Sequence, residues 1–102
     1  MSNKGHNGWS NYETWNVALW VDNDQGAYEH RCEMARRARS PHALASNVKE
    51  WVEDMAPDLG TTMFADLLNA ALSEVDWYEI AENWYAEAHE DDAEDEEEGG
   101  KA

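Results

Sequence analysis

One stretch decides the fold of this chain: residues 11–21, which read Asn11-Tyr12-Glu13-Thr14-Trp15-Asn16-Val17-Ala18-Leu19-Trp20-Val21. It places three large aromatic and three aliphatic side chains within eleven residues. On a helix, Trp15 and Leu19 share one side, whereas Val17 and Val21 point away from that side. A helix with apolar groups on both sides requires cover on both sides. We therefore expect this helix to be the central, buried element of the fold.

Helix-start and helix-stop signals continue along the chain. Ser10 with the glutamate three residues later forms a capping-box pattern. Ser40-Pro41 is typical of a helix start, and Asp76 with Glu79 forms a second capping-box pattern. No stretch shows sustained strand alternation. The sequence therefore predicts an all-α fold, a single small domain of about five short helices. These helices are expected near residues 11–23, 27–39, 41–55, 62–73 and 77–89.

The length of 102 residues indicates one domain. Residues 1–9 are rich in glycine and asparagine and are expected to form a flexible N-terminus. Residues 10–89 carry the helical patterns and form the predicted helical domain. Residues 90–102 are dominated by like charges without apolar groups, which favours a disordered acidic C-terminal tail.

Several features indicate the compartment. Cys32 is the single cysteine, so the chain has no internal disulfide, and a reducing compartment is the natural interpretation. Residues 1–8 lack the apolar core of a signal peptide. No apolar run approaches the roughly 20 residues that a membrane span requires. We expect a soluble, cytoplasmic protein that binds no membrane.

The formal net charge is −16, from 23 acidic and 7 basic residues. Residues 1–39 contain five of each sign, whereas residues 40–102 contain two basic and eighteen acidic residues. The net charge therefore lies in the second part of the chain. Phosphate would be repelled, which argues against direct nucleic-acid binding. A basic protein partner would be attracted.

Enzymatic and metal sites find little support in the sequence. The four histidines are scattered over separate segments without tetrahedral ligand spacing, so we predict no metal. Arginines near Cys32 can lower a thiol pKa, but this cysteine lies on an apolar stripe without a catalytic constellation around it. Phosphate-binding loops and nucleophile elbows are absent from the sequence. We predict a protein that is not an enzyme and has no cofactor.

The aromatic and apolar side chains divide into expected core and expected surface. Tryptophans at core-facing helical positions supply much of a small domain's burial. The expected core tryptophans are Trp15, Trp51, Trp77 and Trp84, and the candidates for exposure are Trp9, Trp20, Tyr78 and Tyr85. The widest apolar face, expected to help cover the core, consists of Met63, Phe64, Leu67, Leu68, Ala71 and Leu72.

The acidic surface has two competing explanations. One is mimicry of nucleic acid, because sixteen net charges correspond to about 27 Å of duplex DNA at one charge per 1.7 Å. The other is solvation, including adaptation to a high-salt cytoplasm. The uneven distribution of the acids favours mimicry. The predicted partner-binding residues are Glu79, Glu82, Glu87, Glu90, Asp91, Asp92, Glu94 and Asp95. Secondary candidates are Arg36, Arg37, Arg39 and Trp20.

Two segments resemble a known family. Asn11-Tyr12-Glu13-Thr14-Trp15, continued by residues 17–20 and 23–26, resembles the opening of a small NYETW-type family of uncharacterised proteins of phages, plasmids and other mobile elements. Residues 65–82 resemble its closing segment. The resemblance covers about a third of the chain. It implies a helical fold and a mobile-element setting, in which small acidic proteins are often counter-defence factors. It implies no catalytic or binding residues.

These observations lead to two functional hypotheses. The first is a mobile-element inhibitor of anti-CRISPR or anti-restriction type, which occupies a basic nucleic-acid-binding surface of a host defence complex or nuclease. The alternative is a homo-oligomeric structural or regulatory protein, in which the arginines of residues 27–39 pair with the acidic helices of another copy. An enzyme using Cys32 or a carboxylate is a third, less supported alternative.

Overall fold

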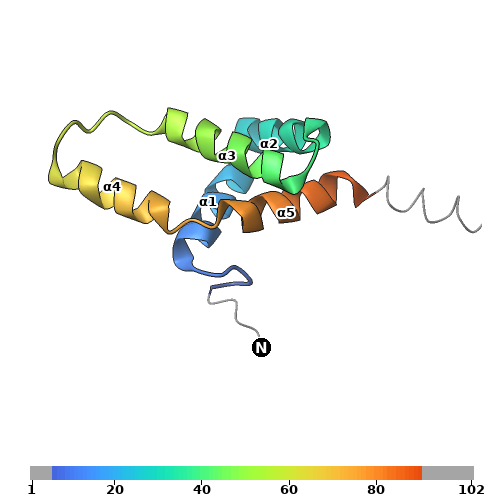
Figure 1. Cartoon of the computed structure of the whole chain (residues 1–102), viewed down its shortest axis with the longest axis horizontal. Coiled ribbons are helices and arrows are strands. Elements are labelled where there is room, and N and C mark those ends of the chain that lie inside the picture. Colours follow the sequence, from blue (N-terminus) through green and yellow to red (C-terminus); the bar gives the residue numbers. More distant parts are fainter. Residues whose placement is uncertain (1–5, 91–102) are drawn as a thin grey trace, which may run out of the picture.

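Five α-helices make up the regular structure of residues 6–90, the part of the chain that the computed structural model describes. No strand occurs in that range. The predicted all-α class with five short helices is confirmed. The predicted flexible residues 1–5 and the tail residues 91–102 lie outside the described part. The helices are α1 (Tyr12–Asn23), α2 (Gln25–Arg37), α3 (Pro41–Met55), α4 (Met63–Ser73) and α5 (Trp77–Ala88), shown in Figure 1.

Every helix begins at a side chain that accepts a hydrogen bond from the backbone N–H three residues later. Such caps satisfy an N–H group that would otherwise lack a partner. The caps at Ser40 and Asp76 follow the prediction. The prediction of Ser10 as the first cap is wrong, because Asn11 caps α1. Likewise Asp24 caps α2, so that this helix starts at Gln25, two residues earlier than predicted.

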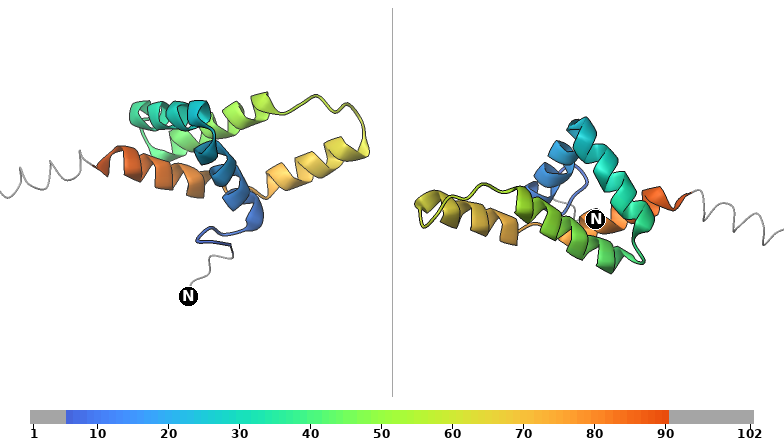
Figure 2. Two further views of the ribbon diagram at one scale, coloured as in Figure 1. Left: turned by 180° about the vertical axis from the view of Figure 1, so that it is seen from behind. Right: turned by 90° about the horizontal axis from the view of Figure 1, so that it is seen from above.

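The centre of the fold is α5, which packs against α3, α2 and α1 (Figures 1 and 2). The expectation that the first helix is the central, doubly covered element is therefore wrong. The buried side of α1 consists of Thr14, Ala18 and Val21, a stripe of small side chains that allows close packing. The buried hydrophobic cluster contains Val21, Ala35, Leu44, Val48, Val75, Ile80, Ala81 and Trp84.

The tryptophans partly follow the prediction. Trp84 is buried at 2% exposure, and Trp51 and Trp77 are partly buried against the core. Trp15, predicted to lie in the core, is half-buried and contacts His6, with ring centroids 4.5 Å apart, outside the main cluster. Two of the candidates for exposure, Trp20 and Tyr78, are exposed, whereas the other two, Trp9 and Tyr85, pack against the core.

Helix α4 stands apart from the other four helices. It begins after the extended segment that follows α3. It forms one end of the molecule, and the C-terminal part of α5 lies at the other end (Figures 1 and 2). None of its residues is buried. The expectation that its wide apolar face covers the core is therefore wrong, and much of that face meets solvent. Among the helices of residues 6–90, none has the length and apolar character to cross a bilayer.

Candidate interaction surfaces

The start of α1 is joined to the start of α5 by side-chain hydrogen bonds. The Ser10 backbone N–H and hydroxyl both donate to Glu79 Oε1, at 3.1 and 2.6 Å. The Thr14 hydroxyl accepts a hydrogen bond of 2.8 Å from the backbone N–H of Asp76. Glu79 is 6% exposed. The prediction that Glu79 lies on the outer face of its helix is therefore wrong, and its carboxylate serves as an internal hydrogen-bond acceptor.

Asn11 completes this junction. Its side-chain oxygen accepts the N–H of Thr14 at 2.9 Å, while its side-chain nitrogen donates to the carbonyl of Glu74 at 2.7 Å. One side chain thus caps α1 and binds the end of α4. The two segments that carry the family resemblance meet here in space. Ser10, Asn11 and Thr14 therefore have a structural role at this junction, which explains their residue types.

The outer face of α5 carries fewer free acids than predicted. Glu82 and Glu90 are exposed and have no ion pair within residues 6–90. Eight residues of helix separate them, which corresponds to about 12 Å. Phosphates of one DNA strand follow each other every 3.4 Å along the axis. Within the described residues, α5 and the two residues that follow it therefore present a sparse acidic array. The other predicted acids, Asp91, Asp92, Glu94 and Asp95, lie outside the described residues.

Glu87, the remaining predicted acid, belongs to a cluster around Arg31. This arginine is 4% exposed and lies between the rings of Tyr28 and Trp84, with its Cζ atom 4.7 and 5.0 Å from their centroids. Its Nε atom donates to Asp22 at 3.0 Å, and its Nη1 atom donates to Glu87 at 3.1 Å. Burial opposes the charged form, but the two carboxylates outweigh burial and raise the pKa of the Arg31 guanidinium.

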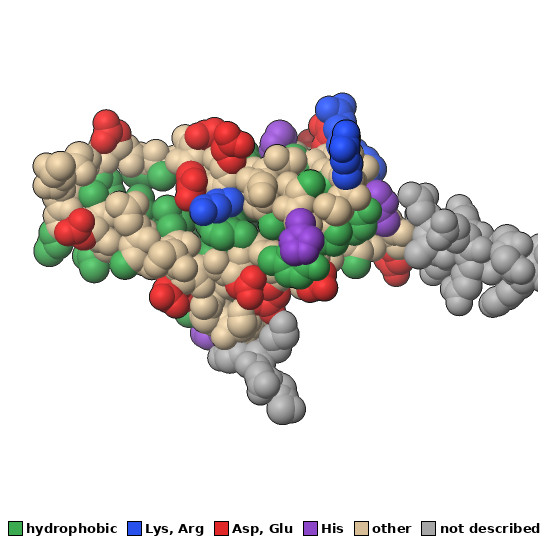
Figure 3. Space-filling model, in the orientation of Figure 1, with side chains coloured by type: hydrophobic (Ala, Val, Ile, Leu, Met, Phe, Trp, Pro, Cys, Tyr) green, Lys and Arg blue, Asp and Glu red, His purple; other side chains and the backbone are tan. Residues whose placement is uncertain are grey.

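The three arginines named as secondary candidates, Arg36, Arg37 and Arg39, are exposed. Arg37 pairs with Glu33 of the same helix at 2.8 Å. Arg36 and Arg39 have no ion pair within residues 6–90. Together they form a small basic region at the end of α2 and just beyond it, which Figure 3 shows on the edge of the molecule near the C-terminal end of the described chain. The sequence indicated this region, but it did not indicate that Arg31 is withdrawn from it.

The described residues contain no group of three or more histidine, cysteine, aspartate or glutamate side chains that could hold a metal ion. Each described histidine instead lies beside an aromatic ring, at centroid distances between 4.1 and 5.3 Å. Cys32 is free and half-buried. It lines a small hollow with Arg31, Arg36 and Glu87. No histidine lines that hollow.

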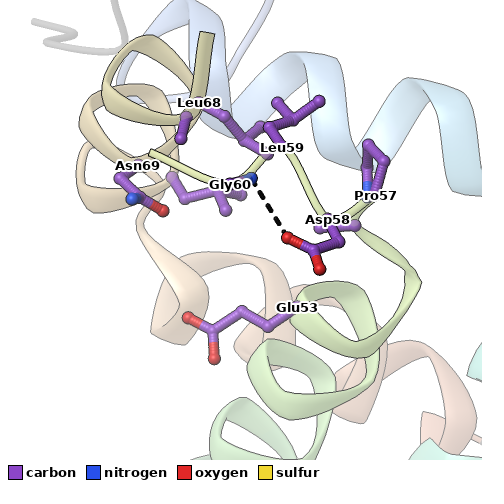
Figure 4. Close-up of a pocket in the computed structure, with 10 residues that line it drawn as sticks. Glu53, Pro57, Asp58, Leu59, Gly60, Leu68 and Asn69 are labelled. Atoms are coloured by element: carbon purple, nitrogen blue, oxygen red, sulfur yellow. Dashed lines mark hydrogen bonds between the residues drawn. The ribbon is translucent and has the colours of Figure 1, made fainter. Parts of the chain in front are cut away.

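A second hollow lies between the end of α3, the segment after it and α4 (Figure 4). Its volume is about 320 Å³. Glu53 and Asp58 border it from one side, Leu68 and Asn69 from the other, and the Gly60 N–H donates to Asp58 at 3.1 Å. Half of its lining residues are exposed, and none is buried. It is therefore a surface depression that results from the loose packing of α4.

The most extensive apolar surface involves α4 and the neighbouring ends of α1 and α3. We call Met63, Phe64 and Leu67 the apolar ridge, since they lie on one side of α4 and each is at least 60% exposed. Next to it lies an apolar groove of about 650 Å³. The groove is lined by Trp20, Val52, Met55, Ala56, Pro57, Leu68 and Leu72.

Trp20 is the one predicted partner-binding residue that lies in this groove, and it is 67% exposed. The apolar ridge is a surface that was not predicted from the sequence. One signal was present in the sequence, because the polar residues of α4, Asp66, Asn69 and Ser73, occupy only a narrow side of that helix. A helix with apolar groups over more than half its circumference has more apolar surface than one contact with a core can cover.

Comparison with known proteins gives a family without a function. The chain belongs to a family of unknown function, DUF7249, whose model matches residues 2–97. No curated protein and no solved structure matches the chain. The family description names neither an activity nor a source, so the mobile-element setting stays a prediction.

Proposed function

We propose that this protein is a non-enzymatic inhibitor that occupies a basic, nucleic-acid-binding surface of a host defence complex or nuclease. The observation that carries the proposal is the excess of acids over their partners. Sixteen acidic side chains fall within residues 6–90, and three of them, Asp22, Glu33 and Glu87, pair with an arginine. The remaining surface attracts a cationic partner in competition with nucleic acid.

The fold also limits which acids can act in this way. Glu82 and Glu90 are exposed and unpaired within residues 6–90, whereas Glu79 and Glu87 hold the fold together through Ser10 and Arg31. Because the acids of α5 alone are sparse, mimicry requires acids from several parts of the chain. The tail acids Asp91, Asp92, Glu94 and Asp95 are the natural extension of this surface in the sequence.

A capture experiment from host lysate tests this proposal. The full-length protein is immobilised, and captured proteins are identified and then challenged with duplex DNA. Nucleic-acid-binding proteins that are released by the duplex and by rising salt are expected, because both ligands use the same cationic surface. Capture that neither the duplex nor salt reduces would contradict the proposal.

Charge variants locate the surface. Glu82→Lys with Glu90→Lys should abolish capture, as should neutralising the four tail acids together. A control with the same change of net charge is Glu29→Lys with Glu50→Lys, two exposed positions on α2 and α3. If the control loses as much binding as Glu82→Lys with Glu90→Lys, then binding depends on the net charge of the protein and not on the predicted surface. Glu79 and Glu87 are left intact because their reversal would disturb folding.

The second functional candidate, self-association through arginines, is favoured by one observation. Arg36 and Arg39 are exposed without an ion pair within residues 6–90, in a molecule with a large acidic excess. Ion pairs between copies would weaken as salt rises. Light scattering at low and high salt tests this candidate, which predicts oligomers that dissociate in salt and in Arg36→Glu with Arg39→Glu.

A further inference from the structure

We infer that α4 is a dimerisation element, and that the apolar ridge of one copy fills the apolar groove of a second copy. This inference does not depend on the proposed inhibitor function. It starts from the state of α4, which has a wide apolar face but no buried residue. Leu72 of this helix lines four separate hollows. Protein interiors are close-packed, so α4 lacks the cover that its sequence requires.

The area of this surface matches what a dimer needs. Five large apolar side chains, Trp20, Met55, Met63, Phe64 and Leu67, are between 55% and 67% exposed. If each offers about 200 Å² when fully exposed, they present about 600 Å² per copy. Stable interfaces bury about 600–1,000 Å² per partner. This area is at the upper end of the about 300–600 Å² of the largest apolar patch on a typical monomer, and such patches are often functional.

The shape of the surface indicates a second copy of this chain as the occupant. The apolar ridge lies on a helix that stands apart from the other four (Figure 2), and the groove beside it has a volume of about 650 Å³. A twofold axis that places the ridge of one copy in the groove of another makes the same contact twice. Trp20 and Met55 in the groove would then be covered by Phe64 and Leu67 of the other copy.

The charge distribution supports the same choice. Asp66 is the only charged residue of α4, whereas each of the other four helices carries at least two charged residues. Two copies of a chain with a net charge of −16 repel each other least where the charge is lowest. Salt screens the remaining repulsion and does not weaken apolar burial. This dimer should therefore persist or tighten at high salt, in contrast to one formed through Arg36 and Arg39.

Analytical ultracentrifugation of the full chain tests the inference. The wild type should sediment as a dimer at micromolar concentration in low and high salt. Phe64→Glu places a charge in the buried ridge and should weaken association at least a hundredfold with unchanged helix content. The control Asn69→Glu adds the same charge to an exposed, polar position of the same helix and should leave the dimer intact. A wild-type monomer at all concentrations, or equal dissociation of both variants, would overturn the inference.

Hydroxyl-radical footprinting distinguishes a second copy from closure of α4 over its own groove. In a dimer, oxidation of Trp20 and Met55 should be low at high protein concentration and should rise on dilution. The same side chains should be oxidised at all concentrations in Phe64→Glu. Protection that does not change on dilution would mean that the chain covers its own groove, and it would refute the dimer.

Discussion

The buried Arg31 cluster offers a quantitative test of how this small fold tolerates charge. The guanidinium is 4% exposed, and its two carboxylate partners come from α1 and α5. Asp22→Asn and Glu87→Gln each remove one negative charge but keep an oxygen that can accept the hydrogen bond. We predict that the double variant destabilises the protein by more than the sum of the two single variants.

The magnitude follows from the exposure of the three side chains. The side chains of Asp22 and Glu87 are 43% and 55% exposed, so water solvates each carboxylate in part and each single loss should cost about 1 kcal/mol. With both charges removed, Arg31 keeps a buried cation beside two aromatic rings and no anion. An uncompensated buried charge costs about 3–5 kcal/mol. The expected coupling between the two positions is therefore about 1–3 kcal/mol.

Urea unfolding followed by circular dichroism measures this coupling as a double-mutant cycle. Glu33→Gln is the matched control, since it removes the carboxylate of the exposed Arg37–Glu33 pair. That pair should contribute no more than about 0.5 kcal/mol. Additive losses at Asp22 and Glu87, or a control as costly as Glu87→Gln, would refute the assignment of Arg31 as a buried cation that needs both partners.

Two further predictions concern the packing of the helices. Thr14→Val removes the hydroxyl that accepts the hydrogen bond from the Asp76 N–H at a buried position. This variant should lower the free energy of unfolding by about 1–3 kcal/mol. A variant as stable as the wild type would argue against this bond. Leu44→Ala, in the core, should cost about 2–5 kcal/mol, whereas Leu67→Ala on α4 should change stability by less than about 0.5 kcal/mol when the chain is monomeric. A large loss at Leu67 would mean that α4 packs against its own chain.

The local features of the fold were predictable from the sequence. The caps at Ser40 and Asp76 and the five helical segments follow from short patterns that act within a few residues. The disulfide-free, helical character followed from composition in the same way. These features depend on neighbouring residues and not on how the helices are arranged.

The arrangement was harder to predict, because hydrophobicity states which residues gain from burial but not which surfaces meet. Trp15 and Leu19 dominate the pattern of the first helix, yet the small Thr14 and Ala18 form its buried side. Glu79 resembled a surface acid, and its bonds to Ser10 connect positions 69 residues apart, which no local pattern reports. The Arg31 cluster is equally non-local, since Glu87 lies 56 residues further along the chain.

The junction between residues 10–14 and residues 74–79 has a consequence for the order of events during protein synthesis. Its three connections span 62 to 69 residues, so α1 leaves the ribosome long before its partners exist. Chains emerge N-terminus first, and contacts between distant residues carry a cost of loop closure. The apolar surfaces of α1, α2 and α3 that pack against α5 therefore remain uncovered until α5 has been synthesised. The junction between α1 and α5 should therefore form only after residues 77–88 have been synthesised.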